Sequence, residues 1–349
     1  MKNILPLAYF KDHIKIVDQT KLPLELKYVS CRNERDVSDA IKKMKIRGAP
    51  AIGIAGAFGL YLGIRNFKST DKDRFIKRTV EVAEYLAESR PTAVNLSWAL
   101  EELKKKVLHN YRRSIGELKD IAYKEAVHIM QDDQKRCRLM GAFGAKLIKN
   151  KDVCLTICNA GGMATSGYGT ALGVFFKAKE DGRKFEVFAC ETRPLLQGAR
   201  ITSWELMQKK IKTTLICDSM AASLIKRGII KKIFVGADRI TLSGDFANKI
   251  GTYNLAVLAK FHNIPFYVVA PLSTFDKNLK SGKDIPIEFR NKDEITSLYF
   301  KKRIAPPGVR VVNPAFDVSD AKLVSAFVTE KGLIKPPYKI NIRKIIHAQ

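Results

Sequence analysis

The sequence predicts an α/β protein with two domains: a mainly helical N-terminal domain carrying a small antiparallel sheet, and a C-terminal domain built on a doubly wound parallel sheet. The chain has 349 residues, 46% of them hydrophobic, so it is long enough for two domains with sizeable cores. Helical periodicity dominates up to about residue 150, and beyond it apolar runs alternate with helical segments. Such alternation is typical of a parallel sheet covered by helices. We place the domains at residues 1–130 and 131–349.

The N-terminal domain is expected to begin with short strands in "IKIVDQT" and "LELKYVS" and to continue as helices. Helical periodicity runs through "RDVSDAIKKM", "APAIGIAGAFGLYLG", "DRFIKRTVEVAEYLAES", "SWALEELKKKVLHNY" and the long segment that starts "IGELKDIAYKEAV". No linker rich in Pro, Gly or Ser marks the boundary. We therefore expect the long helix near residues 115–149 to join the domains directly.

One stretch of this domain, Gly48 to Ile64, carries no charge and has about the shortest length that spans a bilayer. Four of its glycines recur at helical spacing, which a buried helix packed closely against its neighbours explains. We therefore expect no membrane span. The opening residues, "MKNILPLAYFKDHIK", have too short an apolar segment for a secretory signal.

The C-terminal domain shows six apolar runs that predict strands: "VCLTIC", "FEVFAC", "TTLIC", "KKIFVGA", "PFYVVA" and "VRVVNPA". Helical segments lie between most of them, at 166–180, 198–210, 219–228 and 248–262. Ligands of open parallel sheets bind beyond the carboxyl ends of the strands. The residues that follow each run are therefore the first candidates for a site.

Charge and cysteine content narrow the class of protein. The formal charge is +27, but the Lys and Arg residues are scattered and no aromatic residues interleave with them, so we expect no nucleic-acid partner. The six cysteines form no CxxC pair, which favours reduced thiols in the cytoplasm. The five histidines have no ligand spacing, so we expect neither a metal nor a cofactor.

A glycine-rich stretch, "TICNAGGMATSGYGTALG", runs from Thr156 to Gly173 and follows the first of these strands. A strand, a glycine-rich turn and the start of a helix together suggest an anion site, because helix N-termini present unpaired N–H groups. "GYGTALG" also resembles the dinucleotide fingerprint GxGxxG. That fingerprint fails on placement, because Gly167 lies nine residues beyond Cys158.

Polar residues follow the strands of the C-terminal domain. Cys158 follows the first, Glu191 the second, Asp218 the third and Asp238 the fourth. Asp218 is an ordinary N-cap residue, and capping is the role we favour for it. Asp238 is followed by "RITLSGD" rather than by a helix, so a cap does not explain it.

Several long motifs identify a family. They are "KIRGAPAIGIAGAFGL", "RPTAVNLSWAL", "CNAGGMATSGYGTALG", "ETRPLLQGARITSWEL", "VGADRITLSGDFANKIGTYNLAVLAKFHNIPFYVVAP", "IPIEFR" and "NPAFDVS". Through them nearly the whole chain resembles the methylthioribose-1-phosphate isomerases of methionine salvage. The wider superfamily includes ribose-1,5-bisphosphate isomerase and the regulatory subunits of translation initiation factor 2B. The resemblance implies a Rossmann-like C-terminal domain and a homodimer.

The resemblance also implies the residues of the site. Cys158 and Asp238 correspond to the catalytic pair. Substrate contacts carry over to Arg47, Gly48, Ala49, Arg90, Gln197, Asn248 and Lys249. Because these residues come from both parts of the chain, we expect a cleft between the domains. The chain departs from the family where "THCNAG" is usual and Ile157 replaces the His, and where Cys190 replaces an acid before "ETRP".

The implied reaction fits these residue types. A sugar phosphorylated on its anomeric oxygen cannot open as a free sugar does, so an acid must assist the ring oxygen, a role for Asp238. Hydrogen then moves from C2 to C1, with Cys158 as proton shuttle or as a stabiliser of a hydride shift. Arg residues suit the phosphate. A ribose-1,5-bisphosphate isomerase and a non-catalytic regulatory subunit remain as alternatives.

Overall fold

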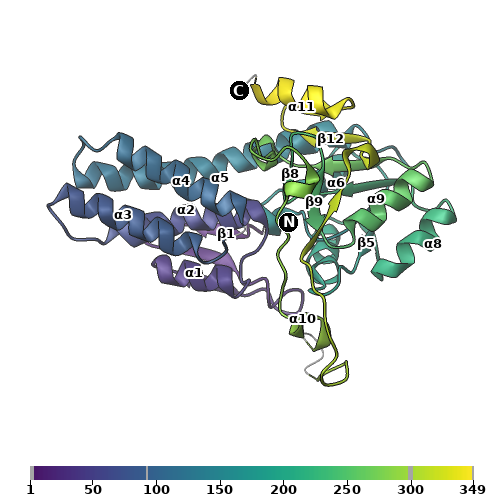
Figure 1. The fold of residues 1–349 in the computed structure, drawn as a ribbon, viewed down its shortest axis with the longest axis horizontal. Helices are drawn as coiled ribbons and strands as arrows, with labels where there is room; N and C mark the ends of the chain where they lie inside the picture. Colours follow the sequence, from purple (N-terminus) through teal and green to yellow (C-terminus); the bar gives the residue numbers. More distant parts are fainter. Residues whose placement is uncertain (1–3, 92, 298–301, 348–349) are drawn as a thin grey trace. The chain divides into compact units, whose positions relative to one another are not determined.

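A computed structural model describes residues 4–91, 93–297 and 302–347 (Figure 1). Its contacts divide the chain into two compact units. The first contains residues 1–137 together with 161–169, and the second contains 138–160 together with 170–349. The middle of the glycine-rich stretch therefore packs with the N-terminal unit, although its two ends belong to the C-terminal one. The domain boundary between residues 130 and 131 stays a prediction.

The N-terminal unit is mainly helical and carries a small antiparallel sheet of order β1-β2-β3, as the sequence predicts. Its elements are β1 (Leu7–Tyr9), β2 (Ile14–Val17), β3 (Tyr28–Cys31), α1 (Glu34–Lys42), α2 (Ala49–Arg65), α3 (Lys72–Ala87), α4 (Val94–His109) and the first part of α5 (Ile115–Ala145). These helices appear in purple to blue in Figure 1. One hydrophobic core joins the sheet to the helices.

Helix α2 contains almost all of the uncharged stretch from Gly48 to Ile64, and it is buried along almost its whole length. Glycine is required where neighbours touch its backbone: a Cβ at Gly53 would lie 2.6 Å from the carbonyl oxygen of Asn95, and one at Gly63 would lie 2.6 Å from Val82 Cγ1. The stretch is therefore a packed core helix. In the described part of the chain, no helix combines the length and apolarity needed to cross a membrane.

The C-terminal unit alternates strands and helices. Its helices are α6 (Ala171–Glu180), α7 (Ser203–Gln208), α8 (Ala221–Lys226), α9 (Thr252–Phe261), α10 (Asp293–Thr296) and α11 (Tyr338–His347). Its strands are β4 (Val153–Thr156), β5 (Glu186–Cys190), β6 (Lys212–Ile216), β7 (Lys232–Val235), β8 (Arg239–Ile240), β9 (Phe246–Lys249), β10 (Phe266–Val269), β11 (Phe316–Ser319), β12 (Ala326–Thr329) and β13 (Gly332–Ile334).

Seven of these strands form one sheet of order β13-β12-β10-β7-β4-β5-β6, and all neighbours are parallel except β12 and β13. The chain builds outwards in one direction from β4 and in the other from β7. The pair β4–β7 is therefore the point at which the strand order reverses, where ligands of such sheets bind. The predicted α/β class with a doubly wound parallel sheet is confirmed.

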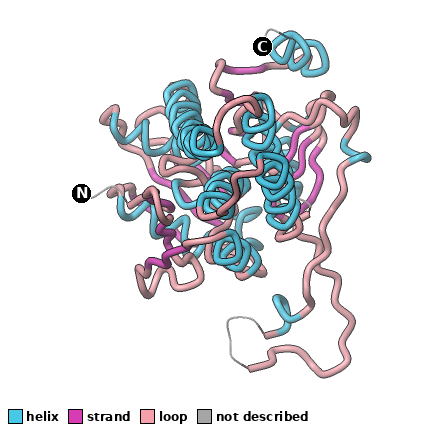
Figure 2. Tube along the Cα trace, turned by 90° about the vertical axis from the view of Figure 1, so that its left-hand side faces the viewer, coloured by secondary structure: helices cyan, strands magenta, loops and turns pink. Residues whose placement is uncertain are grey.

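Three element predictions are wrong, and one of them is the helix expected over 166–180, which begins only at Ala171. Residues 309–315, "VRVVNPA", form no strand of the large sheet, and β12 pairs beside β10 instead. The apolar run is misleading because Val309 and Val312 are exposed. The helix expected over 248–262 begins only at Thr252, and Asn248 and Lys249 lie on β9 of a separate three-stranded antiparallel sheet. Figure 2 shows α10 in the long loop connection between β10 and β11.

Candidate active site

Cys158 lies two residues beyond β4, in an unusual backbone conformation with a φ of 68°. Residues other than glycine rarely adopt a positive φ, and such strain concentrates at functional sites. Two threonines hold the residue: its N–H donates to Thr192 Oγ1 at 2.9 Å, and its carbonyl accepts from Thr202 Oγ1 at 2.6 Å. Cys158 is thus held at the strand end in a fixed, strained conformation.

The thiol of Cys158 lies against the amide of Gln197, whose Nε2 is 3.4 Å from Sγ. Gln197 is only 1% exposed, and no donor within the described residues reaches its Oε1. The same holds for the Oδ1 of buried Asn159, whose Nδ2 donates to Glu205 Oε1 at 2.7 Å. A buried acceptor without a donor costs free energy. Two buried amide oxygens, on Gln197 and on the neighbour of Cys158 in the chain, therefore lack a donor among the described residues.

Asp238 lies three residues beyond β7, the neighbour of β4 in the sheet. Its N–H donates to the carbonyl of Ala247 at 2.9 Å, and the chain continues directly into β8. As the sequence predicts, no helix follows for this carboxylate to cap. The two strand ends approach closely, because a Cβ at Gly236 would lie 3.1 Å from the Cβ of Ala160. Cys158 and Asp238 therefore follow adjacent strands at the point where the strand order reverses.

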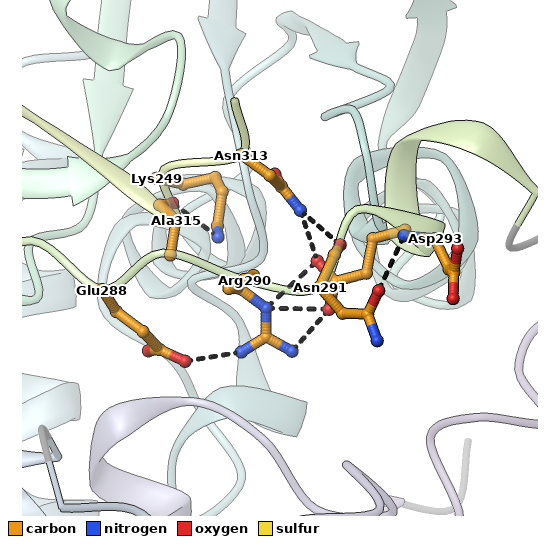
Figure 3. Close-up of polar contacts among 8 residues, drawn as sticks. Lys249, Glu288, Arg290, Asn291, Asp293, Asn313 and Ala315 are labelled. Carbon is orange, nitrogen blue, oxygen red and sulfur yellow. Dashed lines mark hydrogen bonds and ion pairs between the residues drawn. The ribbon is translucent and has the colours of Figure 1, made fainter. Parts of the chain in front are cut away.

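Asn248 and Lys249 lie at the end of β9 and are both buried. Asn248 Nδ2 donates to Thr252 Oγ1 at 2.9 Å. Lys249 is 7% exposed, and its Nζ donates to the carbonyl of Ala315 at 2.7 Å (Figure 3). The same Nζ lies 4.8 Å from the centre of the Phe316 ring. A buried ammonium requires such partners. Lys249 therefore places a buried positive charge at the end of β9.

A cluster of charged residues fixes the segment that carries Ala315 (Figure 3). Arg290 Nε donates to Glu294 Oε1 at 2.8 Å, and its Nη1 donates to Glu288 at 3.0 Å. Asn313 Nδ2 donates to Glu294 Oε2 at 3.2 Å. The N–H of Ala315 donates to the carbonyl of Glu288 at 2.8 Å. The carbonyl of Ala315, which accepts the hydrogen bond from Lys249, is thereby held in place by a network of ion pairs and hydrogen bonds.

Asp317 is a functional candidate that sequence reasoning did not single out, although "NPAFDVS" contains it. It lies opposite Asn248 in the β9–β11 register, and its carboxylate accepts from the N–H groups of Gly251 at 2.7 Å and Tyr253 at 3.1 Å. It therefore caps α9, whose own N-cap residue is a glycine. Burial raises the pKa of Asp317 to about 6, and the two N–H groups and Lys249 oppose that rise.

Asp218 does not cap a helix, contrary to our expectation. Its Oδ1 accepts from the N–H of Thr192 at 2.8 Å, and its Oδ2 accepts from the N–H of Arg193 at 2.7 Å. A cap preference describes only the local chain, whereas these donors come from the end of a neighbouring strand. The carboxylate therefore joins the end of β6 to the end of β5.

In the N-terminal unit, Arg47, Gly48 and Ala49 lead into α2. Gly48 is the N-cap with a φ of 94°, and a Cβ there would lie 2.5 Å from the backbone of Ala164 in the glycine-rich stretch. The first turn of α2 contains no acidic residue. The helix N-terminus thus presents N–H groups and a positive dipole end beside that stretch, which suits an anion.

The glycine-rich residues 161–169 are anchored by two polar side chains of the same unit. Gln19 Nε2 donates to the carbonyl of Met163 at 2.7 Å, and Asp133 Oδ2 accepts from Ser166 N at 2.8 Å and from Ser166 Oγ at 2.5 Å. Burial raises the pKa of Asp133, and the bonds from Ser166 oppose that rise. No local sequence signal identifies either anchor, because both contacts join residues far apart in the chain.

Arg90 lies three residues past the end of α3, and its N–H donates to the carbonyl of Ala87 at 3.2 Å. Arg47, Gly48, Ala49 and Arg90 thus belong to the N-terminal unit, and the other predicted site residues belong to the C-terminal one. Within each unit the structure brings several of them to one region, beside α2 and at the strand ends. Across the described residues, no group of three or more His, Cys, Asp and Glu side chains has a metal-binding arrangement.

Comparisons with known proteins show that the chain is similar to sugar-phosphate isomerases along nearly its whole length. A methylthioribose-1-phosphate isomerase from Thermosipho africanus is 52% identical, with 98% of each chain covered, and a 5-deoxyribose 1-phosphate isomerase from Moorella thermoacetica is 49% identical, with 98% of this chain and 97% of that one covered.

Two solved structures share the fold over almost the whole chain. The 5-methylthioribose 1-phosphate isomerase from Pyrococcus horikoshii matches with a TM-score of 0.93 and 42% identity, covering 100% of this chain and 97% of that one. A structure described as translation initiation factor 2B, subunit delta, from A. fulgidus matches with a TM-score of 0.88 and 45% identity, covering 99% of both chains. The model of the initiation factor 2 subunit family matches residues 45–336. The chain therefore belongs to the initiation factor 2 subunit family.

Proposed function

We propose that this protein is an aldose–ketose isomerase that converts 5-methylthioribose 1-phosphate to 5-methylthioribulose 1-phosphate in methionine salvage. The observation that carries the proposal is the pair Cys158 and Asp238, a thiol and a carboxyl that follow adjacent parallel strands where the strand order reverses. Relatives that carry the isomerase name are 50–52% identical over nearly the full chain.

The reaction needs an acid and a proton carrier. Asp238 protonates the ring oxygen so that the furanose opens, a step that general acid catalysis accelerates. The hydrogen at C2 then moves to C1. Cys158 removes and returns that proton through an enediol, or it stabilises the intermediate if a hydride moves directly. In both routes the fixed backbone of Cys158 keeps the thiol in place.

The remaining predicted residues bind the substrate. Arg47, Arg90 and the N–H groups of Gly48 and Ala49 take the C1 phosphate, because guanidinium groups and helix N-termini both favour phosphate. The ammonium of Lys249 and the amide of Asn248 take further oxygens. The buried Oε1 of Gln197 accepts from a sugar hydroxyl, which gives that oxygen the donor it lacks.

The residues proposed above bind the C1 phosphate and the sugar oxygens, so they leave the substituent at C5 unspecified. A relative at 49% identity is named for 5-deoxyribose 1-phosphate, which, like the methylthio sugar, is uncharged at C5. Ribose 1,5-bisphosphate carries a second phosphate there, and burying an unpaired charge is costly. We therefore expect a substrate with an uncharged C5 group.

The test is turnover of three substrates by the purified protein. We expect kcat/KM for methylthioribose 1-phosphate to exceed that for ribose 1,5-bisphosphate at least about a hundredfold, which corresponds to about 2.7 kcal/mol. Equal or better use of 5-deoxyribose 1-phosphate would shift the physiological substrate within the uncharged class. A preference for the bisphosphate would reject the assignment.

A regulatory subunit is the second candidate function, since one relative at 45% identity is described as an initiation factor subunit. Retention of both Cys158 and Asp238 favours the enzyme. Absence of turnover with all three sugar phosphates, together with retained binding of one, would favour the regulatory role. We further propose a cytoplasmic homodimer that binds no nucleic acid. Sedimentation of the purified protein with and without RNA tests the last two points.

A further inference from the structure

Thr192 has the least expected backbone conformation near the candidate site. Its φ is 66°, and it is fully buried. A positive φ is rare for any residue with a side chain and is a genuine outlier for a β-branched one. Such a conformation persists only where the surroundings enforce it, and it points to a function.

The surroundings of Thr192 do enforce it. The carboxylate of Asp218 accepts from the N–H of Thr192 at 2.8 Å and from the N–H of Arg193 at 2.7 Å, so both of its oxygens hold this turn. Arg193 is held in turn, because its Nη2 donates to the carbonyl of Ile295 at 3.0 Å. Gly198 completes the enclosure: a Cβ there would lie 2.6 Å from Thr192 Oγ1 and would collide with the carbonyl of Cys190.

The hydroxyl of Thr192 uses both of its hydrogen-bonding capacities. Oγ1 donates to the carbonyl of Cys190 at 3.0 Å and accepts from the N–H of Cys158 at 2.9 Å. Its own proton is thus directed away from Cys158, which leaves a lone pair for the cysteine N–H. The contact joins the ends of β5 and β4 and fixes the strained backbone of Cys158.

We propose that Thr192, clamped by Asp218, is a positioning residue that sets the backbone of Cys158 and thereby the place of its thiol. Proton transfer requires the reacting groups to be held within a fraction of an ångström of the productive geometry. The role of Thr192 in catalysis rests on the proposed isomerase function, whereas its hold on Cys158 does not.

The experiment compares Thr192→Val, which keeps the branched shape and removes the hydroxyl, with Thr192→Ser, which keeps the hydroxyl. Thr214→Val is the matched control, because the Thr214 hydroxyl donates to Glu186 at 2.6 Å in the same sheet. Two quantities are measured for each folded variant: kcat and KM for methylthioribose 1-phosphate, and the rate at which iodoacetamide labels Cys158, followed by mass spectrometry of its peptide.

We expect Thr192→Val to lower kcat about ten- to a hundredfold with less than about a threefold change in KM, since one misplaced group in a catalytic pair has effects of this size. Labelling of Cys158 should change at least threefold in that variant. Thr192→Ser and Thr214→Val should stay within about threefold of the wild type in both quantities.

Wild-type kcat and labelling in folded Thr192→Val would overturn the proposal, as would equal losses in Thr214→Val. If Thr192→Val does not fold, Asp218→Asn tests the proposal instead, because it weakens the same clamp at a partly exposed position. Unchanged kcat and labelling in Asp218→Asn would also overturn the proposal. If the wild type lacks turnover with every sugar phosphate, the labelling rates alone test the hold on Cys158.

Discussion

The predicted site residues of the two units are built in different ways. Among those of the N-terminal unit, Arg47 and Arg90 offer guanidinium groups, whereas Gly48 matters for its backbone: its φ is positive, and its missing side chain lets Ala164 approach the start of α2. Those of the C-terminal unit work through side chains: the thiol of Cys158, the amide of Gln197 and the ammonium of Lys249 each have defined neighbours.

The difference separates two tasks. Backbone N–H groups at a helix N-terminus suit a phosphate, whose charge is the same before and after the reaction. Side chains that exchange protons suit the carbons and oxygens that react. Substitutions in the N-terminal set should therefore raise KM, and substitutions of the proposed catalytic pair, Cys158 and Asp238, should lower kcat. The following predictions, from the largest effect to the smallest, test that separation.

Asp238→Asn should lower kcat by about a hundredfold or more, because an amide cannot supply the proton that opens the ring. KM should change little, since the fold and the phosphate contacts remain. Steady-state kinetics with methylthioribose 1-phosphate measure both constants. Wild-type kcat in this variant would show that Asp238 takes no part in the reaction. It would also contradict the assignment of the catalytic task to the C-terminal unit.

Gly48→Ala should raise KM about tenfold or more and change kcat less. The new Cβ would meet the Ala164 backbone at 2.5 Å, and alanine is strained at a φ of 94° by about 1–3 kcal/mol. Gly182→Ala is the matched control, because Gly182 has a φ of 78° with nothing near its Cβ position. A fall in kcat alone would contradict the division of tasks.

Asp133→Asn should raise KM by about five- to tenfold, since it weakens the anchor of Ser166 by about one hydrogen bond. The preceding residue supplies the control: Asp132 pairs with Arg136 at 2.7 Å on the same helix and has no contact with the glycine-rich stretch among its described bonds. Asp132→Asn should leave KM unchanged. Equal effects of the two substitutions would mean that the anchor has no specific role.

Asp317 predicts a small dependence of stability on pH. Its pKa is raised from 3.8 to about 6 in the folded protein, so the folded state binds a proton more tightly than the unfolded chain does. The stability linked to that proton is fully present below about pH 4 and is lost as pH rises through about 6. Asp317→Asn should therefore remove part of the fall in unfolding free energy as pH rises from about 4 to just above 6.

Urea unfolding at several pH values measures that difference between wild type and variant. Asp320→Asn is the control, because the Asp320 side chain is largely exposed and pairs only loosely with Lys322, at 3.5 Å. Parallel stability curves for wild type and Asp317→Asn would show that Asp317 does not titrate in this range.

The local sequence was a good guide where a segment's own residues decide its structure. The period of apolar residues located α2, α5 and most strands of the large sheet, and the absence of a helix after Asp238 was readable from "RITLSGD". It failed for residues 309–315, because an apolar run cannot reveal whether a neighbouring strand is available to pair with it. It also failed for Asp218, whose partners come from another strand.

By itself, the sequence determined the α/β class and the family, and it predicted the pair Cys158 and Asp238 as the catalytic residues, because periodicity and long motifs are local properties of the chain. Tertiary structure alone decided how those residues are held. Three contacts join segments at least 25 residues apart in the chain. They are the clamp of Asp218 on Thr192, the cap that Asp317 places on α9, and the anchor of Asp133 on Ser166. Such contacts depend on which strands and helices become neighbours, and the burial that shifts the pKa of Asp317 arises only when they do.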